Sequence, residues 1–130
     1  MILGLHHAQI TIPKGAEAEA RDFYCGLLGF REVEKPDVLK GRGGFWLKVG
    51  KDDLHVGTED GVDRSTTKAH MAYEVNSLET FRRLFDERGI EVEDGIQIPG
   101  YRRFEIRDPF GNRLEFMERL EETESVSSKA

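Results

Sequence analysis

Three of the four histidines and one glutamate occupy matching places in two weakly similar halves of the chain. His7 and His55 fall in the first half, whereas His70 and Glu115 fall in the second. Imidazole and carboxylate are favoured ligands for divalent transition metals in proteins. This pattern predicts one metal site that is built from strands distant in sequence.

The order of the expected elements shows an internal repeat. Each half contains an apolar strand, an amphipathic helix that ends at a glycine, and three further strand-like runs. Gly29 and Gly89 are 60 positions apart, as are His55 and Glu115, and a nearly constant offset of this kind indicates two βαβββ modules. The expected elements are a strand over 5–12, a helix over 16–28 and runs that end near residue 56, then a strand over 71–75, a helix over 77–88 and runs that end near residue 117.

Alternation along the strands predicts the direction of each candidate ligand. Successive side chains of a strand point to opposite faces of the sheet. His55 lies between Leu54 and Val56, and the first strand and the two strands of the second half alternate in the same way. The candidate ligands are therefore expected on the face opposite the helices. If the two halves form one curved sheet, the four side chains converge on its concave side.

Composition and charge restrict the class of protein. The 130 residues suffice for one domain with a core. This domain is expected over 1–120, with modules at about 5–57 and 69–118, and a polar, flexible tail is expected over 121–130. The net charge of −6 argues against a nucleic-acid or membrane-surface role. Because no membrane span or signal peptide is evident, and the single Cys25 cannot form an internal disulfide, we expect a cytoplasmic protein.

Three motifs carry a family resemblance: Leu5-His6-His7, Phe23-Tyr24 followed by Leu27-Leu28-Gly29-Phe30, and the eight residues from Asp108 to Glu115. Together they resemble the vicinal-oxygen-chelate superfamily, which includes glyoxalase I, fosfomycin-resistance enzymes, extradiol dioxygenases, methylmalonyl-CoA epimerase and bleomycin-resistance proteins. The resemblance covers about 5–118. It implies an α+β fold in which two βαβββ modules form a half-open eight-stranded barrel with the helices outside. It also implies a homodimer, often with a site completed by both chains.

The resemblance places metal ligands on the first and fourth strands of each module, and these places match His7, His55, His70 and Glu115. Glyoxalase I usually has an acidic ligand on the strand that carries His55, so the imidazole departs from a standard glyoxalase I. His55 is expected to be a fourth ligand, with a nearby base or a hydrogen-bond partner of a ligand as the alternatives.

Other members of the superfamily differ from this chain elsewhere. Fosfomycin enzymes place a tyrosine where Glu105 stands, which argues against a phosphonate pocket. Extradiol dioxygenases keep two histidines and one glutamate, but they use further His and Tyr residues around the substrate, and here only His6 is spare. Bleomycin-resistance proteins have the fold without the metal, and the presence of all four ligand types argues against that group.

The predicted function is that of a metal-dependent enzyme of glyoxalase type. One divalent ion, Zn, Ni, Co, Mn or Fe, is expected to bind vicinal oxygens of a small-molecule substrate and to stabilise an enolate-like intermediate. Glu115, or His55 if it is released from the metal, is expected to carry the proton. One alternative is an Fe(II) extradiol-type dioxygenase with two His and one carboxylate as ligands. Another is a metal-free drug- or metabolite-binding protein of bleomycin-resistance type.

Several further residues are candidates for the substrate-facing surface. Trp46 alternates with buried-type neighbours, and Arg103 lies on one face of the seventh strand, where an arginine could clamp a carboxylate or phosphate. The ordinary structural alternatives are that Trp46 fills the core and that Arg103 lies on a solvated face. The predicted lining residues are Gln9, Trp46, Lys48, Tyr101, Arg103 and Glu105.

Overall fold

The computed structural model describes residues 1–121 and divides the chain into two compact units, Met1–Asp63 and Arg64–Ala130. We call them the N-terminal and the C-terminal unit. Each is a βαβββ module with its own four-stranded sheet, which confirms the predicted α+β class and the two modules. Apart from Glu121, the predicted tail over 121–130 lies outside the described residues. Within residues 1–121, no helix is long and apolar enough to cross a membrane.

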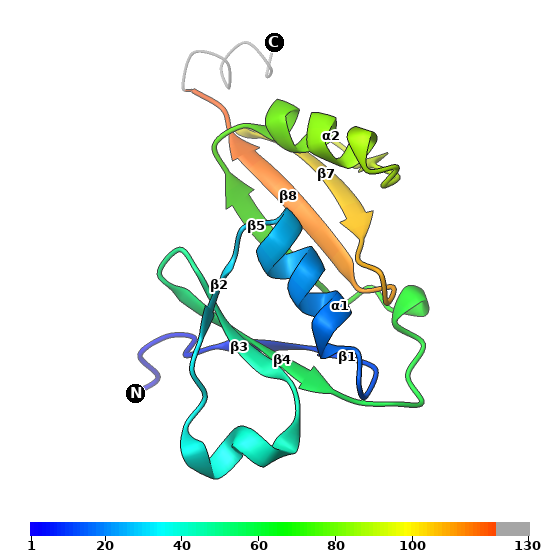
Figure 1. The fold of residues 1–130 in the computed structure, drawn as a ribbon. Helices are drawn as coiled ribbons and strands as arrows, with labels where there is room; N and C mark the ends of the chain where they lie inside the picture. Colours follow the sequence, from blue (N-terminus) through cyan, green and yellow to red (C-terminus); the bar gives the residue numbers. More distant parts are fainter. Residues whose placement is uncertain (122–130) are drawn as a thin grey trace. The chain divides into compact units, whose positions relative to one another are not determined.

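In the N-terminal unit the sheet has the order β1-β4-β3-β2, with β1 parallel to β4 and the other pairs antiparallel (Figure 1). The parallel pairing joins the two strands on which ligands are predicted. The elements are β1 (Ala8–Ile12), α1 (Glu17–Arg21), the π-helical segment η1 (Asp22–Leu27), β2 (Arg31–Val33), the 3-10 helix η2 (Asp37–Arg42), β3 (Phe45–Val49) and β4 (Asp52–Thr58).

Two boundaries in the N-terminal unit differ from the prediction. The strand expected over 5–12 begins only at Ala8, because the preceding residues have no strand partner and Leu5 is fully exposed. The helix expected over 16–28 is a short α-helix that continues as a π-helix, and this wider winding still buries Phe23 and Tyr24. Gly29, at φ +80°, follows the helical segment as predicted, since glycine adopts this backbone conformation at little cost.

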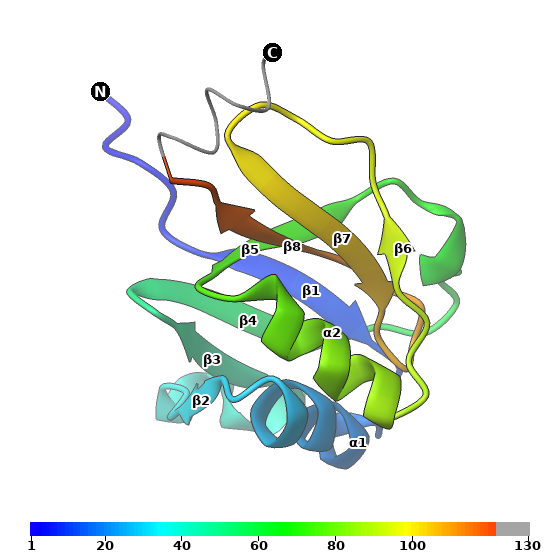
Figure 2. The ribbon, with the colours of Figure 1, turned by 90° about the horizontal axis from the view of Figure 1, so that it is seen from above.

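The C-terminal unit repeats the topology with the order β5-β8-β7-β6, again with the first and last strands parallel. β6 is a two-residue strand at the edge beside β7 (Figure 2). The elements are the 3-10 helix η3 (Arg64–Thr66), β5 (His70–Val75), α2 (Leu78–Glu87), β6 (Glu93–Asp94), β7 (Tyr101–Arg107) and β8 (Arg113–Arg119).

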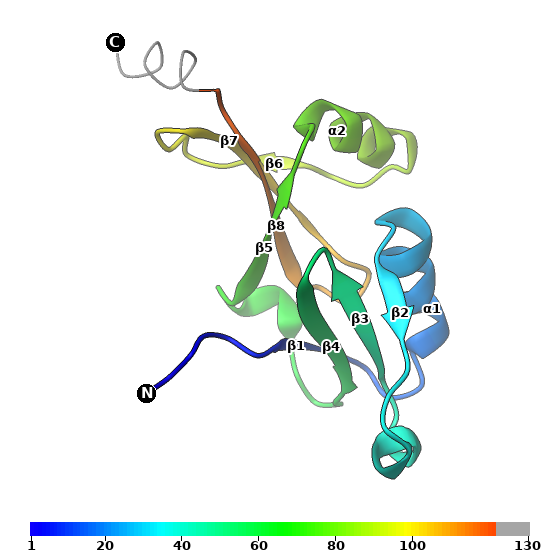
Figure 3. The same cartoon turned by 90° about the vertical axis from the view of Figure 1, so that its left-hand side faces the viewer.

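Helix α2 covers one face of the C-terminal sheet (Figure 3). Its start is fixed by Ser77, whose hydroxyl accepts a hydrogen bond from the Thr80 backbone N–H at 3.3 Å, as a helix cap does. Phe81 and Phe85 pack on Phe116 of β8, with ring centroids 5.5 and 5.4 Å apart. Because this face of the sheet is filled by the helix, the polar side chains of β5, β7 and β8 lie on the opposite face.

Candidate metal centre

His55 is sandwiched between two aromatic rings in the N-terminal unit. Strand register places it beside Gln9 of β1 and Trp46 of β3, so these three side chains share the face predicted for them. The Trp46 ring stacks on His55 with centroids 3.9 Å apart and planes 3° apart, and the His7 ring stacks on it at 4.1 Å and 19°. With both ring faces covered, His55 can reach a ligand only through its nitrogens, in the plane of the ring.

The electrostatics of this stack favour a neutral imidazole. Burial lowers the pKa of His55, and the nearby positive charge of His7 lowers it further. A neutral imidazole is the form that binds a metal, since the coordinating nitrogen must carry a free lone pair. The structure thus brings two of the predicted ligands, His7 and His55, into ring contact, with His55 favoured in its neutral form.

Two neighbours of the His7–His55 stack, His6 and Lys48, form hydrogen bonds within the unit. His6 and His7 share a hydrogen bond between their Nδ1 atoms at 3.0 Å, which leaves the Nε2 atom of His7 for another contact. Lys48, a predicted lining residue, donates to the Asp53 carboxylate at 2.7 Å, and this hydrogen bond holds the pKa of Asp53 below its usual value. The charge of Lys48 is therefore already matched within the unit.

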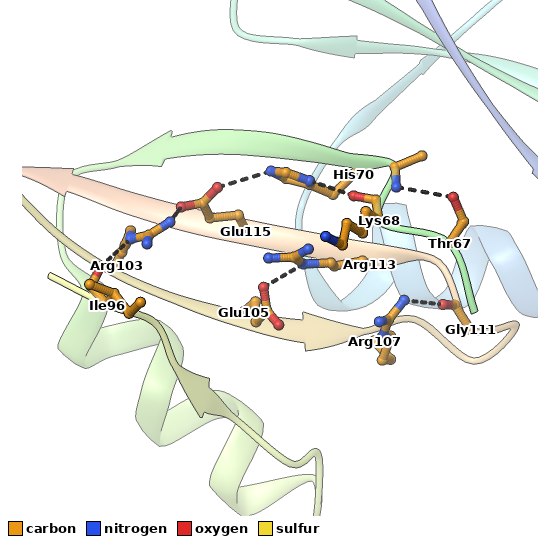
Figure 4. A network of polar contacts seen from close by, with 11 residues as sticks. Thr67, Lys68, His70, Ile96, Arg103, Glu105, Arg107, Gly111, Arg113 and Glu115 are labelled. Carbon is orange, nitrogen blue, oxygen red and sulfur yellow. Dashed lines mark hydrogen bonds and ion pairs between the residues drawn. The ribbon is translucent and has the colours of Figure 1, made fainter. Parts of the chain in front are cut away.

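In the C-terminal unit Glu115 is held between a histidine and an arginine (Figure 4). Its side chain is only 8% exposed. Oε1 lies 3.2 Å from Nε2 of His70, and Oε2 accepts a hydrogen bond from Nη1 of Arg103 at 2.8 Å. The structure thus brings together the other two predicted ligands, and it commits one oxygen of the carboxylate to the arginine.

The contacts of His70 determine which of its nitrogens is available. Nδ1 lies 3.0 Å from the Lys68 carbonyl oxygen, which only accepts hydrogen bonds, so Nδ1 carries the proton. In a neutral ring, Nε2 then presents a lone pair to Glu115 Oε1, and two acceptors face each other at 3.2 Å. A second proton on His70 or a cation bound by both atoms resolves this repulsion. A backbone carbonyl that orients the distal nitrogen is also the usual support of a metal-bound histidine.

The remaining predicted lining residues of the C-terminal unit have structural partners. Arg103 also donates from Nε to the Ile96 carbonyl at 2.7 Å, so it is not a free clamp for a substrate anion. Glu105 forms an ion pair with Arg113. Tyr101 lies under the guanidinium of Arg119, 5.1 Å from the ring centroid to Cζ. Arg103 thus acts on the carboxylate of Glu115, a role that its sequence position alone did not indicate.

Each unit by itself contains two of the four predicted ligands. Within residues 1–121, no cluster of three or more His, Cys, Asp or Glu side chains is arranged to hold a metal ion. The pairs His7–His55 and His70–Glu115 are each in place, and their union in one four-ligand site remains a prediction.

The face of the N-terminal unit that carries the histidine stack opens into a cavity of about 620 Å³. Its wall includes the predicted residues Gln9 and Trp46 and, in addition, Lys35, Leu39 and Arg42. Sequence reasoning missed these last three because they fall in a segment without strand or helix periodicity. The cavity can admit a small molecule beside the imidazoles.

Comparison with known proteins identifies the family. The model of the Glyoxalase/Bleomycin resistance protein/Dioxygenase superfamily matches residues 4–116. A solved structure of a protein assigned to the glyoxalase family, from Bacillus anthracis, is 42% identical, with a TM-score of 0.84 over 92% of this chain and 98% of that chain. No functionally curated protein matches the sequence.

More distant structures share the fold. The fosfomycin resistance protein FosX from Listeria monocytogenes, solved with Mn(II) and sulfate, is 15% identical, with a TM-score of 0.73 and complete coverage of both chains. The antibiotic binding protein TnmS3 from Streptomyces sp. CB03234 is 18% identical, with a TM-score of 0.69 over 92% of this chain and 100% of that chain. The family match and the close relative together show that this chain belongs to the glyoxalase/bleomycin resistance/dioxygenase superfamily.

Proposed function

We propose that the protein is a metal-dependent enzyme of glyoxalase type that acts on a small molecule with two adjacent oxygens. The observation that carries the proposal is the pair His70–Glu115, in which Nε2 and Oε1 lie 3.2 Å apart and, in a neutral ring, are both acceptors. Two acceptors in this arrangement fit a shared cation. The stacked histidines His7 and His55 would supply two further nitrogen donors.

His7, His55, His70 and Glu115 are the residues that would hold the metal. When bound, a divalent ion supplies a Lewis acid that polarises the substrate oxygens and stabilises negative charge on them. Zinc, nickel, cobalt, manganese and iron all accept this donor set. FosX, which shares the fold, has been solved with Mn(II).

The protein's own residues then position the donors and move the proton. Arg103 fixes Oε2 of Glu115, so Oε1 is the atom left for a metal or a proton. The stack confines His55 to contacts in its ring plane, and the lowered pKa keeps it able to accept a proton. Either Glu115 or His55 is therefore suited to carry the proton of an enolisation.

A dioxygenase is the second candidate, because His7, His70 and Glu115 alone form a set of two histidines and one carboxylate. His55→Gln separates the two candidates. The glyoxalase-type proposal expects weaker metal binding or a turnover that falls about a hundredfold in a folded protein. Unchanged metal binding and turnover would favour the dioxygenase, with His55 as a bystander.

The test is the metal content of protein purified without chelator. We expect one divalent ion per site and its loss in His70→Ala, with Glu105→Gln as a control that alters a neighbouring acidic side chain outside the donor set. A wild type without tight metal binding, or a His70→Ala variant with unchanged stoichiometry, would support the metal-free binding protein instead. We also propose a homodimer, which light scattering at micromolar concentration would test.

A further inference from the structure

Two cations on the cavity wall of the N-terminal unit have no acidic partner within residues 1–121. The ammonium of Lys35 donates to the Gly43 carbonyl at 2.7 Å, which fixes its position and leaves its charge unmatched. Arg42, at the end of η2, forms no hydrogen bond or ion pair with any described residue. Lys35 also lies near enough to His55 for its charge to contribute to the lowered pKa of the imidazole.

Three other cations of the same unit are matched by carboxylates. Lys48 pairs with Asp53, Arg21 with Glu32, and Lys40 with both Glu34 and Asp37. The one acidic residue of the cavity wall, Asp53, is the partner of Lys48. The cavity therefore carries excess positive charge, although the chain has a net charge of −6. Like charges gathered in a cleft attract a ligand of the opposite sign.

The rest of the wall is partly apolar. Trp46, Leu39 and Val56 contribute ring and aliphatic surface beside the two cations. A ligand that matches both parts has an anionic group at one end and an apolar or flat body at the other. A guanidinium binds a carboxylate or a phosphate with two parallel hydrogen bonds, and an ammonium adds a point charge.

We propose that Arg42 and Lys35 form an anion-binding subsite of this cavity, and that the substrate is a small organic carboxylate or phosphate whose body lies against Trp46. The inference rests on the proposed function, because the same cavity contains the His7–His55 pair. It assigns to η2 and its preceding loop the role of selecting the charge of the substrate. The metal ligands serve the reacting oxygens, whereas this subsite serves a different part of the molecule.

Trp46 is the only tryptophan of the chain, so its fluorescence reports binding in the cavity. The probes are benzoate, phenyl phosphate and the neutral benzamide, titrated at constant ionic strength into full-length protein freed of metal by chelation. Removing the metal excludes direct coordination of the probe. The variants are Arg42→Met and Lys35→Met. Lys51→Met is the matched control, because Lys51 is exposed, lies outside the cavity wall and forms no hydrogen bond or ion pair with any residue of the described part of the chain.

We expect the wild type to bind benzoate or phenyl phosphate at least about fivefold more tightly than benzamide. In Arg42→Met and Lys35→Met this preference should fall about fivefold, whereas Lys51→Met should keep it. The tighter of the two anions identifies the head group. Equal affinity for all three probes, or equal losses in Lys51→Met and Arg42→Met, would overturn the subsite. Metal stoichiometry, measured separately on the same variants, tests the proposed function: normal metal binding without anion preference refutes only the subsite.

Discussion

Replacing Glu115 with glutamine separates the stability of the C-terminal unit from its proposed metal binding. The amide has the same shape as the carboxylate. Its oxygen can still accept the hydrogen bond from Arg103, and its nitrogen can donate to Nε2 of His70, which presents a lone pair while Nδ1 is bonded to the Lys68 carbonyl. The substitution therefore turns two facing acceptors into a donor–acceptor pair.

The expected change in the free energy of unfolding is small when no metal is present. A hydrogen bond that involves a charged group contributes about 1.5–3 kcal/mol, and the bond to the amide keeps the charge of the guanidinium but loses that of the carboxylate. The contact with Arg103 therefore weakens by about 1 kcal/mol, from the upper to the lower part of that range. The new hydrogen bond to His70 returns about 1 kcal/mol. The chelated Glu115→Gln protein should thus unfold within about 1 kcal/mol of the chelated wild type.

Added metal should distinguish the two proteins. A ligand at a hundred times its dissociation constant stabilises the folded state by about 2.7 kcal/mol, and the neutral amide is a poorer ligand than the carboxylate. Urea denaturation with chelator and with excess Zn²⁺ or Mn²⁺ measures both quantities. Glu105→Gln is the control, since Glu105 lies opposite Glu115 in the strand register and pairs with Arg113. If chelated Glu115→Gln loses more than about 3 kcal/mol of unfolding free energy, Glu115 is a structural ion-pair residue. If added metal stabilises Glu115→Gln as much as the wild type, Glu115 is not a ligand.

Two further predictions concern the N-terminal unit. The Gly44 backbone N–H donates to the Glu17 carboxylate at 3.2 Å and holds the pKa of that carboxyl below its usual value. Glu17 therefore stabilises the folded protein above the pKa that it has in the unfolded chain, and this contribution is lost as the pH falls through the lower folded pKa. The stability difference between wild type and Glu17→Gln should therefore shrink from pH 7 toward pH 3 in urea titrations, and a constant difference would contradict this linkage. Gly44→Ala should lower the free energy of unfolding by about 3 kcal/mol or more, because φ is +76° and a Cβ would lie 2.1 Å from the Val56 carbonyl oxygen. Gly41→Ala is the control: a Cβ at Gly41 meets open space, so this substitution should lower the free energy of unfolding far less.

Strand alternation predicted the direction of the candidate ligands because it depends only on local sequence. His55 lies between two buried aliphatic neighbours, and the register confirms that it shares a face with Gln9 and Trp46. The same local rule placed Glu115 opposite the face that packs under α2. The order of strands and helices along the chain could also be anticipated, since the repeat and the family resemblance both imply two βαβββ modules.

The partners of long side chains could not be predicted in this way. Arg103 lies opposite Met117 in the register, yet its guanidinium reaches diagonally to the carboxylate of Glu115. A flexible side chain can satisfy its charge on several neighbours, and sequence spacing does not choose among them. The cations of the cavity, Lys35 and Arg42, lie in a loop and at the end of the short 3-10 helix η2, where the sequence shows no periodicity that indicates direction. Sequence periodicity therefore predicts which face of a strand or helix a side chain lies on, whereas its hydrogen-bond and ion-pair partners are known only from the three-dimensional structure.

The division of the donors between two units leads to a test of assembly. Each unit has its own sheet and buried core. If the four proposed donors form one site, each unit supplies one pair, and the two pairs come from the same chain or from two chains. The family resemblance implies a dimer, often with a site completed by both chains, and the test below distinguishes that arrangement from sites built within single chains. His7→Ala and His70→Ala each remove one donor from a different pair, and neither homodimer should bind metal tightly. A heterodimer of the two variants, isolated with two affinity tags, would then regain one intact site and bind one ion, whereas sites built within single chains would leave it empty.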